Sequence, residues 1–129
     1  MNAQYNSIIF DLGRVVLNLD YNRTVNAFKE LGKENFDRLY TQSNQDKIFD
    51  LFETGSITAA EFRKYMKAFL DDSVPESAID NAWNAMLLDL PPQRIELLLK
   101  LKERYKIFLF SNTNEIHLEA FRNIISVTY

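Results

Sequence analysis

The chain has 129 residues, of which 47% are hydrophobic and 13% aromatic, so it can fill the core of one ordinary domain and is not a disordered chain. Its formal net charge is −3 and it has no basic run, which argues against nucleic acid as a partner. It contains no cysteine, which excludes disulfides and thiolate catalysis. Its first residues lack the basic and then apolar pattern of a signal peptide, and no apolar run reaches the ~20 residues that span a membrane, so we expect a cytoplasmic protein without a membrane partner.

The first predicted element is a short strand over residues 7–10 (SIIF). Ile8, Ile9 and Phe10 are β-branched or aromatic and make it apolar on both faces, which is typical of a buried parallel strand. Gly13 then lets the chain turn, and residues 15–19 (VVLNL) are a second short apolar stretch, either a hairpin or an irregular flap. From about residue 22 to 90 the apolar residues recur with helical spacing.

Two pairs of residues in this helical part have the spacing of a capping box. Thr58 and Glu61 precede one apolar stripe, and Gly55 is predicted to end the helix before it. Ser73 and Glu76 repeat the pattern before the next stripe. Both pairs therefore predict helix beginnings within the block.

The last third of the chain is predicted to return to the sheet. Pro91-Pro92 opens a helix over about 92–104, residues 106–110 (KIFLF) form a second apolar strand, and a final helix covers about 114–125. Two strands joined through helices predict parallel pairing in an α/β sheet. We therefore expect a sheet domain over 1–19 and 88–129, with a helical insertion over 20–87.

Polar residues follow both predicted strands. Asp11 comes directly after the first strand, and Ser111, Asn112, Thr113 and Asn114 come directly after the second. Ligands of open α/β sheets bind at the carboxyl ends of the strands. A carboxylate there can attack phosphorus, while a hydroxyl and the amides at a helix N-terminus hold the phosphate oxygens. Since a carboxylate and a phosphate repel each other, we expect Mg²⁺ as the cofactor.

Two segments carry a resemblance to a known family. Phe10-Asp11-Leu12-Gly13 and Phe110-Ser111-Asn112 resemble motifs I and II of the haloacid dehalogenase-like (HAD) hydrolase superfamily. The version here is similar to the branch with α-glucose-1-phosphate phosphatase and the phosphatase domain of epoxide hydrolases. The resemblance implies a Rossmann-like parallel sheet with a helical C1-type cap inserted after the first strand.

The resemblance also implies roles for individual residues. Asp11 would be the nucleophile and a metal ligand, and the backbone carbonyl of Gly13 a second metal ligand. Ser111 and the amide of Asn112 would bind the phosphate, with a helix cap as the alternative role. Further candidate contacts to the substrate are Arg14, Asn114 and His117.

The chain departs from the family pattern at two points. Most phosphatases of the superfamily have an aspartate in place of Gly13 as general acid, and such an acid contributes about 10²–10⁴-fold to the rate. The lysine and the acidic pair that follow motif II in the family are absent after Ser111. We therefore expect the chain to be a fragment with little or no activity, whose open sheet edge invites association with a second copy.

The resulting hypothesis is a phosphatase of small phosphorylated metabolites, with sugar phosphates as the first candidate substrates. Two alternatives stay open at this point. One is a dehalogenase, in which the aspartate displaces halide without a metal. The other is a non-catalytic module that binds phosphate or another protein, for which the missing carboxylate at Gly13 is an argument.

Overall fold

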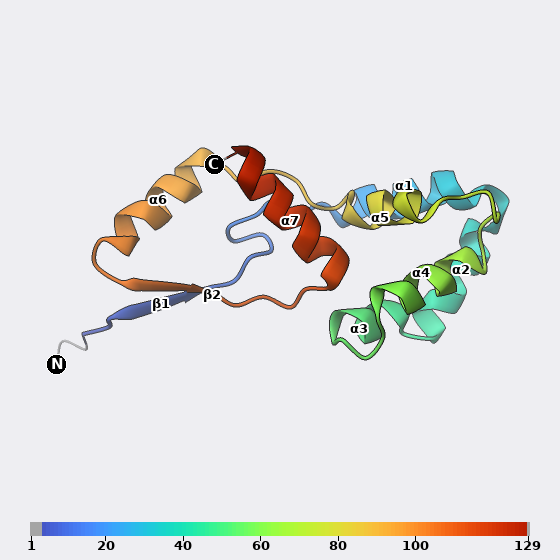
Figure 1. Cartoon of the computed structure of the whole chain (residues 1–129), viewed down its shortest axis with the longest axis horizontal. Coiled ribbons are helices and arrows are strands. Elements are labelled where there is room, and N and C mark those ends of the chain that lie inside the picture. Colours follow the sequence, from blue (N-terminus) through green and yellow to red (C-terminus); the bar gives the residue numbers. More distant parts are fainter. Residues whose placement is uncertain (1–3, 129) are drawn as a thin grey trace. The chain divides into compact units, whose positions relative to one another are not determined.

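The computed structural model describes residues 4–128 of the chain, and its architecture is α/β, as predicted (Figure 1). The backbone divides into two compact units, each of which is described by itself. The sheet unit comprises residues 4–19 and 87–111. The helical unit comprises residues 20–86 and 112–128.

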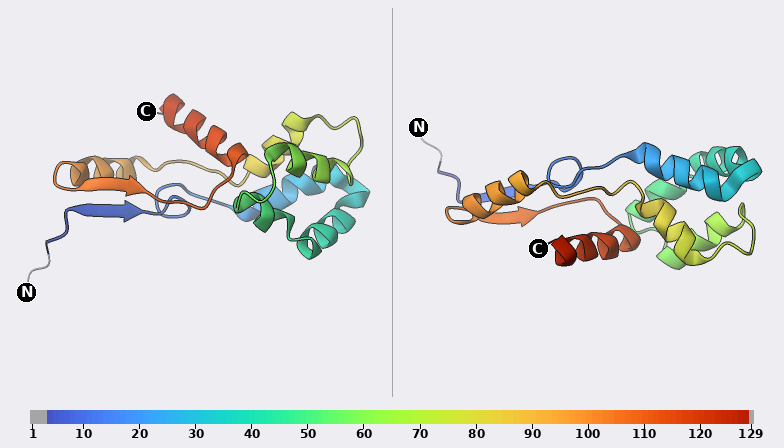
Figure 2. Two further views of the ribbon diagram at one scale, coloured as in Figure 1. Left: turned by 60° about the horizontal axis from the view of Figure 1, so that its bottom comes forward. Right: turned by 90° about the horizontal axis from the view of Figure 1, so that it is seen from above.

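The sheet unit contains strands β1 (Ser7–Phe10) and β2 (Lys106–Leu109) and helix α6 (Pro92–Lys102). The strands pair in parallel, with Ser7 opposite Lys106 and Phe10 opposite Leu109, which confirms the predicted pairing. Helix α6 returns the chain between them and lies along the strands (Figure 2). Just beyond β2, the backbone N–H of Phe110 donates to the carbonyl of Phe10 over 2.8 Å.

The predicted burial of the first strand is wrong for the part of the chain that the structure describes. Ile9 is 70% exposed, and Phe108 on the second strand and Phe110 just beyond it are exposed as well. The reason is that the described sheet has two strands and one helix against them, which cannot cover apolar side chains on both faces.

Residues 15–19, predicted as a hairpin or an irregular flap, close a tight turn that begins at Arg14 and then pair with the segment that leaves the helical block. Arg14 has a positive φ of 63°, and its N–H donates to the carbonyl of Leu17 over 2.7 Å. The N–H of Asn18 donates to the carbonyl of Asp89, and the N–H of Leu88 donates back to the carbonyl of Asn18. The two segments that lead into and out of the helical unit are therefore hydrogen-bonded to each other.

The helical unit contains short helices that pack around one core. These are α1 (Tyr21–Gly32), the 3₁₀ turn η1 (Lys33–Asn35), α2 (Phe36–Gln45), α3 (Ile48–Glu53), α4 (Ala59–Lys67), α5 (Glu76–Asn84) and α7 (Glu115–Thr128).

The core of this unit is built from the predicted apolar stripes. Phe62, Met66 and Ile79 are fully buried, and the ring of Phe62 stacks on that of Phe52 with centroids 4.4 Å apart. The buried hydroxyl of Thr24 donates to the carbonyl of Trp83 over 3.0 Å and accepts from the N–H of Met86, so it joins α1 to the end of α5.

The helix boundaries agree with the sequence signals in part. The Thr58 hydroxyl accepts from the N–H of Glu61 over 3.1 Å, as the first capping box predicts, and Gly55 has a φ of +76° just after α3. The second box is wrong, because α5 begins at Glu76 after Pro75, and no side chain caps it. The N–H of Ser73 donates instead to the Asp71 carboxylate.

The predicted domain boundaries stay a prediction. Up to residue 111 the two compact units follow them to within one residue, but α7 is grouped with the helical unit rather than with the strands. The physical reason for this grouping is the contact of α7 with α5, where the ring of His117 stacks on that of Trp83 with centroids 4.8 Å apart.

The core position of Ile79 generates a stability prediction. Ile79→Ala should lower the free energy of unfolding by about 2–5 kcal/mol, because it leaves a cavity where the side chain is now 0% exposed. Ile125→Ala on α7 is the matched control, since that side chain is 39% exposed, and it should change stability by less than about 0.5 kcal/mol. Urea unfolding measures both, and equal losses would contradict this description of the core.

Candidate active site

The carboxyl ends of β1 and β2 bring Asp11 and Ser111 to the same edge of the sheet. Asp11 directly follows β1 and Ser111 follows β2 after Phe110, and the parallel register with the Phe110–Phe10 hydrogen bond sets the two strand ends side by side. The Asp11 side chain is exposed, and its Oδ1 accepts from the N–H of Leu12 over 2.8 Å. One carboxylate oxygen is thus held by the backbone, which leaves the second available for a metal or for phosphorus.

Gly13 lies where the backbone comes close to a neighbouring side chain. A Cβ atom on Gly13 would lie 2.8 Å from Cδ1 of Leu19, which is the end of a flexible side chain. The adjoining Arg14 is exposed and belongs to the same unit. The sheet unit therefore holds four of the predicted site residues: Asp11, Gly13, Arg14 and Ser111.

The remaining predicted site residues, Asn112, Asn114 and His117, belong to the helical unit. Asn114 caps α7. Its Oδ1 accepts from the backbone N–H of His117 over 2.9 Å and from the indole N–H of Trp83 over 3.2 Å. This arrangement fixes the beginning of the helix that follows the second motif.

His117 is buried and held from two sides. Its Nδ1 lies 2.8 Å from Oδ1 of Asn84, and its ring stacks on Trp83. Burial lowers the pKa of His117 from 6.5 to about 4, so the ring is neutral at physiological pH. With Oδ1 of Asn84 as acceptor, Nδ1 carries the proton and Nε2 is left as an acceptor.

Sequence reasoning did not find Asn84 as a partner of His117. Nor did it find Trp83 as a partner of His117 and Asn114. The two lie more than thirty positions from α7 in the chain. No spacing in the sequence marks such a pairing, because it depends on how α5 and α7 pack together.

No group of three or more histidine, aspartate or glutamate side chains that could hold a metal ion exists among residues 4–128. The residues predicted to bind Mg²⁺, Asp11 and the carbonyl of Gly13, are thus at most a partial ligand set. Mg²⁺ is often held by one or two carboxylates, with water and phosphate oxygens as the other ligands.

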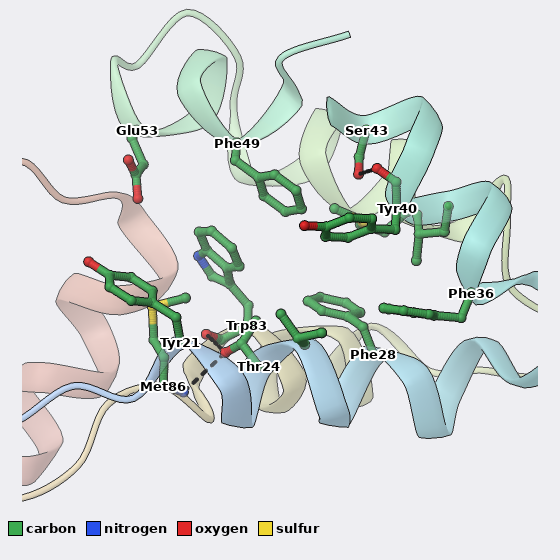
Figure 3. A pocket seen from close by; sticks show the side chains of 13 residues that line it. Tyr21, Thr24, Phe28, Phe36, Tyr40, Ser43, Phe49, Glu53, Trp83 and Met86 are labelled. Atoms are coloured by element: carbon green, nitrogen blue, oxygen red, sulfur yellow. Dashed lines mark hydrogen bonds between the residues drawn. The ribbon is translucent and has the colours of Figure 1, made fainter. Parts of the chain in front are cut away.

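The helical unit also has an apolar cavity of about 220 Å³ between α1, α2, α3 and α5 (Figure 3). The rings of Phe28, Phe49 and Trp83 point into it, with Glu53 at one side. Glu53 is still exposed to solvent, but partial burial and the nearby Asp50 raise its pKa. With this lining the cavity is unsuited to phosphate.

Comparison with known proteins gives relatives that are hydrolases. The chain is 30% identical over 108 residues to a D-ribitol-5-phosphate phosphatase of Bacteroides thetaiotaomicron, and the match covers 84% of this chain and 52% of that protein. No family model matches the chain. The chain spans about half the length of the curated relative that it matches.

Solved structures of similar proteins identify the fold. A HAD family enzyme from Bacteroides thetaiotaomicron superposes with a TM-score of 0.82 at 39% identity, over 92% of this chain and 58% of that one. Its complex with magnesium and inorganic phosphate superposes at 0.78 and 40% identity, over 90% and 57%. A predicted HAD-like family hydrolase from Porphyromonas gingivalis matches at 0.74 and 24% identity, over 91% and 56%. The chain therefore has the HAD hydrolase fold over the part that it spans.

The buried His117 predicts a pH dependence of stability. The folded pKa of about 4 lies below the ordinary value of 6.5, so the unfolded chain takes up the proton first as the pH falls. This contribution is fully present above pH 6.5 and is lost between pH 6.5 and pH 4, by at most about 3 kcal/mol.

His117→Phe is the test, because phenylalanine keeps a ring against Trp83 and does not titrate. Urea unfolding between pH 4 and pH 8 should show a smaller loss of stability on acidification in the variant than in the native protein. Parallel pH profiles of the two proteins would show that His117 is not held neutral by the fold.

Proposed function

We propose that the chain belongs to the HAD hydrolases and that the protein containing it is a phosphatase of small phosphorylated metabolites. The observation that carries the proposal is the pair of parallel strand ends, with Asp11 directly after β1 and Ser111 two residues after the end of β2. The related D-ribitol-5-phosphate phosphatase and the magnesium and phosphate complex of a HAD family enzyme support it. The relatedness to the D-ribitol-5-phosphate phosphatase supports phosphorylated sugars and sugar alcohols as the class of substrate.

In the proposed reaction, the free carboxylate oxygen of Asp11 attacks phosphorus, and the bond from phosphorus to the leaving oxygen breaks. The result is an aspartyl-phosphate. A water molecule then attacks phosphorus, which releases inorganic phosphate and restores the carboxylate. Gly13 offers no acid, so the leaving oxygen takes its proton from water.

Ser111 and the backbone amide of Asn112 are proposed to bind the phosphate oxygens. A serine hydroxyl can donate to a phosphate oxygen, and the amides near a helix N-terminus favour negative charge. Arg14, Asn114 and His117 are proposed contacts to the substrate. Of these, Arg14 suits an anionic group, while neutral His117 suits a hydroxyl.

Mg²⁺ is the proposed cofactor, held by the Asp11 carboxylate and the Gly13 carbonyl together with phosphate and water oxygens. When bound, the ion supplies positive charge that offsets the repulsion between the carboxylate and the phosphate dianion. The exposed, backbone-anchored carboxylate of Asp11 fits this role, and the related HAD family enzyme was crystallised as a magnesium complex.

Asp11→Asn tests the nucleophile in the full-length protein. The variant should lose at least about 10³-fold in turnover of phenyl phosphate and of pentitol phosphates with Mg²⁺ present, because the amide cannot attack phosphorus. Asp72→Asn, the same change at an exposed turn residue, is the matched control and should keep full activity. Undiminished turnover by Asp11→Asn would identify another nucleophile.

Removal of the metal separates the phosphatase from a dehalogenase. Dialysis against EDTA should abolish phosphate release from these substrates, and added Mg²⁺ should restore it, since the carboxylate and the phosphate repel each other without a cation. Turnover that survives EDTA would contradict the proposed use of Mg²⁺.

A further inference from the structure

The apolar cavity of the helical unit has space for an aromatic ring (Figure 3). The residues that line it lie between Tyr21 and Met86, so the cavity belongs to the helical unit alone. Its volume is about 220 Å³, and an apolar cavity of about 150 Å³ is enough to bind benzene. The lining includes the exposed Tyr21 and Tyr40 as well as the buried Phe28 and Trp83, so the cavity opens to solvent.

Aromatic rings form much of the cavity wall. The rings of Phe28, Phe49 and Trp83 point into the cavity. Those of Phe49 and Trp83 are stacked, with centroids 5.3 Å apart. Aromatic side chains attract a further ring through stacked or edge-to-face contact, and their faces attract a cation. The wall therefore favours a ligand that has an aromatic ring, and it tolerates a positive charge close by.

Three polar side chains of the wall already donate to other groups of the protein. The Thr24 hydroxyl donates to the carbonyl of Trp83 over 3.0 Å, and the Ser43 hydroxyl donates to the carbonyl of Tyr40 over 3.0 Å. The indole N–H of Trp83 donates to Asn114. The protons of these three groups are therefore not available to a ligand, which disfavours an anion in the cavity.

Glu53 is a charged side chain of the lining. Figure 3 shows it on α3 at the edge of the aromatic rings, on the side of Tyr21 and Trp83. It makes no ion pair with a residue that the structure describes, and both partial burial and the nearby Asp50 raise its pKa. No lysine, arginine or histidine is among the described residues that line the cavity. The carboxylate thus leaves negative charge at the cavity that a cation would balance.

We propose that this cavity binds a small organic ammonium ion that carries one aromatic ring. The ring lies among Phe28, Phe49 and Trp83, and the ammonium group donates to the carboxylate of Glu53. A hydrogen bond between two charged groups is about twice as strong as one between neutral groups. The inference goes beyond the proposed phosphatase reaction and does not depend on it, because none of the residues assigned to that reaction lines the cavity.

Calorimetric titration of the full-length protein with 2-phenylethylamine tests the inference. This amine is an ammonium ion at neutral pH, and one molecule should bind per chain. 2-Phenylethanol has the same ring and the same chain length without the charge, and it should bind at least about fivefold more weakly. 3-Phenylpropionate, an anion of similar size, should bind more weakly still, because Glu53 repels it.

Glu53→Gln removes the charge with almost no change in side-chain shape. The affinity for 2-phenylethylamine should fall about fivefold, and the affinity for 2-phenylethanol should stay within about twofold. Glu30→Gln on α1 is the matched control, since Glu30 is exposed and does not line the cavity. It makes the same change in net charge and should alter neither affinity.

Phe49→Leu tests the aromatic wall. Leucine keeps an apolar side chain but removes the ring, so the affinity for both ligands should fall by a few-fold. Phe69→Leu is the matched control, because Phe69 is half-buried like Phe49 but does not line the cavity. Circular dichroism checks that each variant keeps its helices.

Three results would overturn the inference. One is no binding of the amine at millimolar concentration, and another is equal affinity for the amine and the alcohol. The third is an unchanged affinity of Glu53→Gln for the amine, which would place the ammonium group at another carboxylate of the protein. The titrations use no phosphate ester, so failure of the amine to bind leaves the proposed phosphatase function standing, and absence of phosphatase activity leaves the cavity inference standing.

Discussion

The parallel register between β1 and β2 is the constraint on which the candidate chemistry depends. Ser7 lies opposite Lys106 and Phe10 opposite Leu109, so Asp11 and Ser111 leave the sheet at one edge. Antiparallel pairing would place these residues at opposite ends of the strands. Helix α6 makes the parallel arrangement possible, because it carries the chain back along the sheet before β2 begins. The proposed nucleophile and phosphate-binding hydroxyl are therefore neighbours through topology, although one hundred positions separate them in the sequence.

In the helical unit, the indole of Trp83 positions candidate site residues at the start of α7. Trp83 stacks on Phe49 with centroids 5.3 Å apart and on His117 at 4.8 Å, and its N–H donates to Asn114. The core of the helical unit thereby fixes the capping residue of α7 and a histidine in its first turn. The core that stabilises the helices therefore also positions two of the proposed contacts to the substrate.

Much of the fold could be predicted, because strands, turns and helix caps depend on residues that are close together in the sequence. Apolar runs ending in polar residues gave both strands, and the left-handed Gly55 and the Thr58 cap were both identified from residue type and spacing. The second capping box failed because the carboxylate of Asp71 holds the N–H of Ser73, and Pro75 takes the position before α5. The packing of α5 against α7 could not be predicted. A hydrophobic pattern shows that one face of a helix becomes buried, but not which helix packs against it.

Gly13 illustrates the difference between a departure in sequence and a constraint of structure. Its φ is not among the positive values found in the described chain, so the backbone there does not need glycine. The atom that a Cβ would meet, Cδ1 of Leu19, is the end of a side chain that can turn away. The fold would therefore accept a side chain at this position, and the missing carboxylate is a chemical property of this chain. In the proposed phosphatase reaction, the leaving oxygen therefore takes its proton from water.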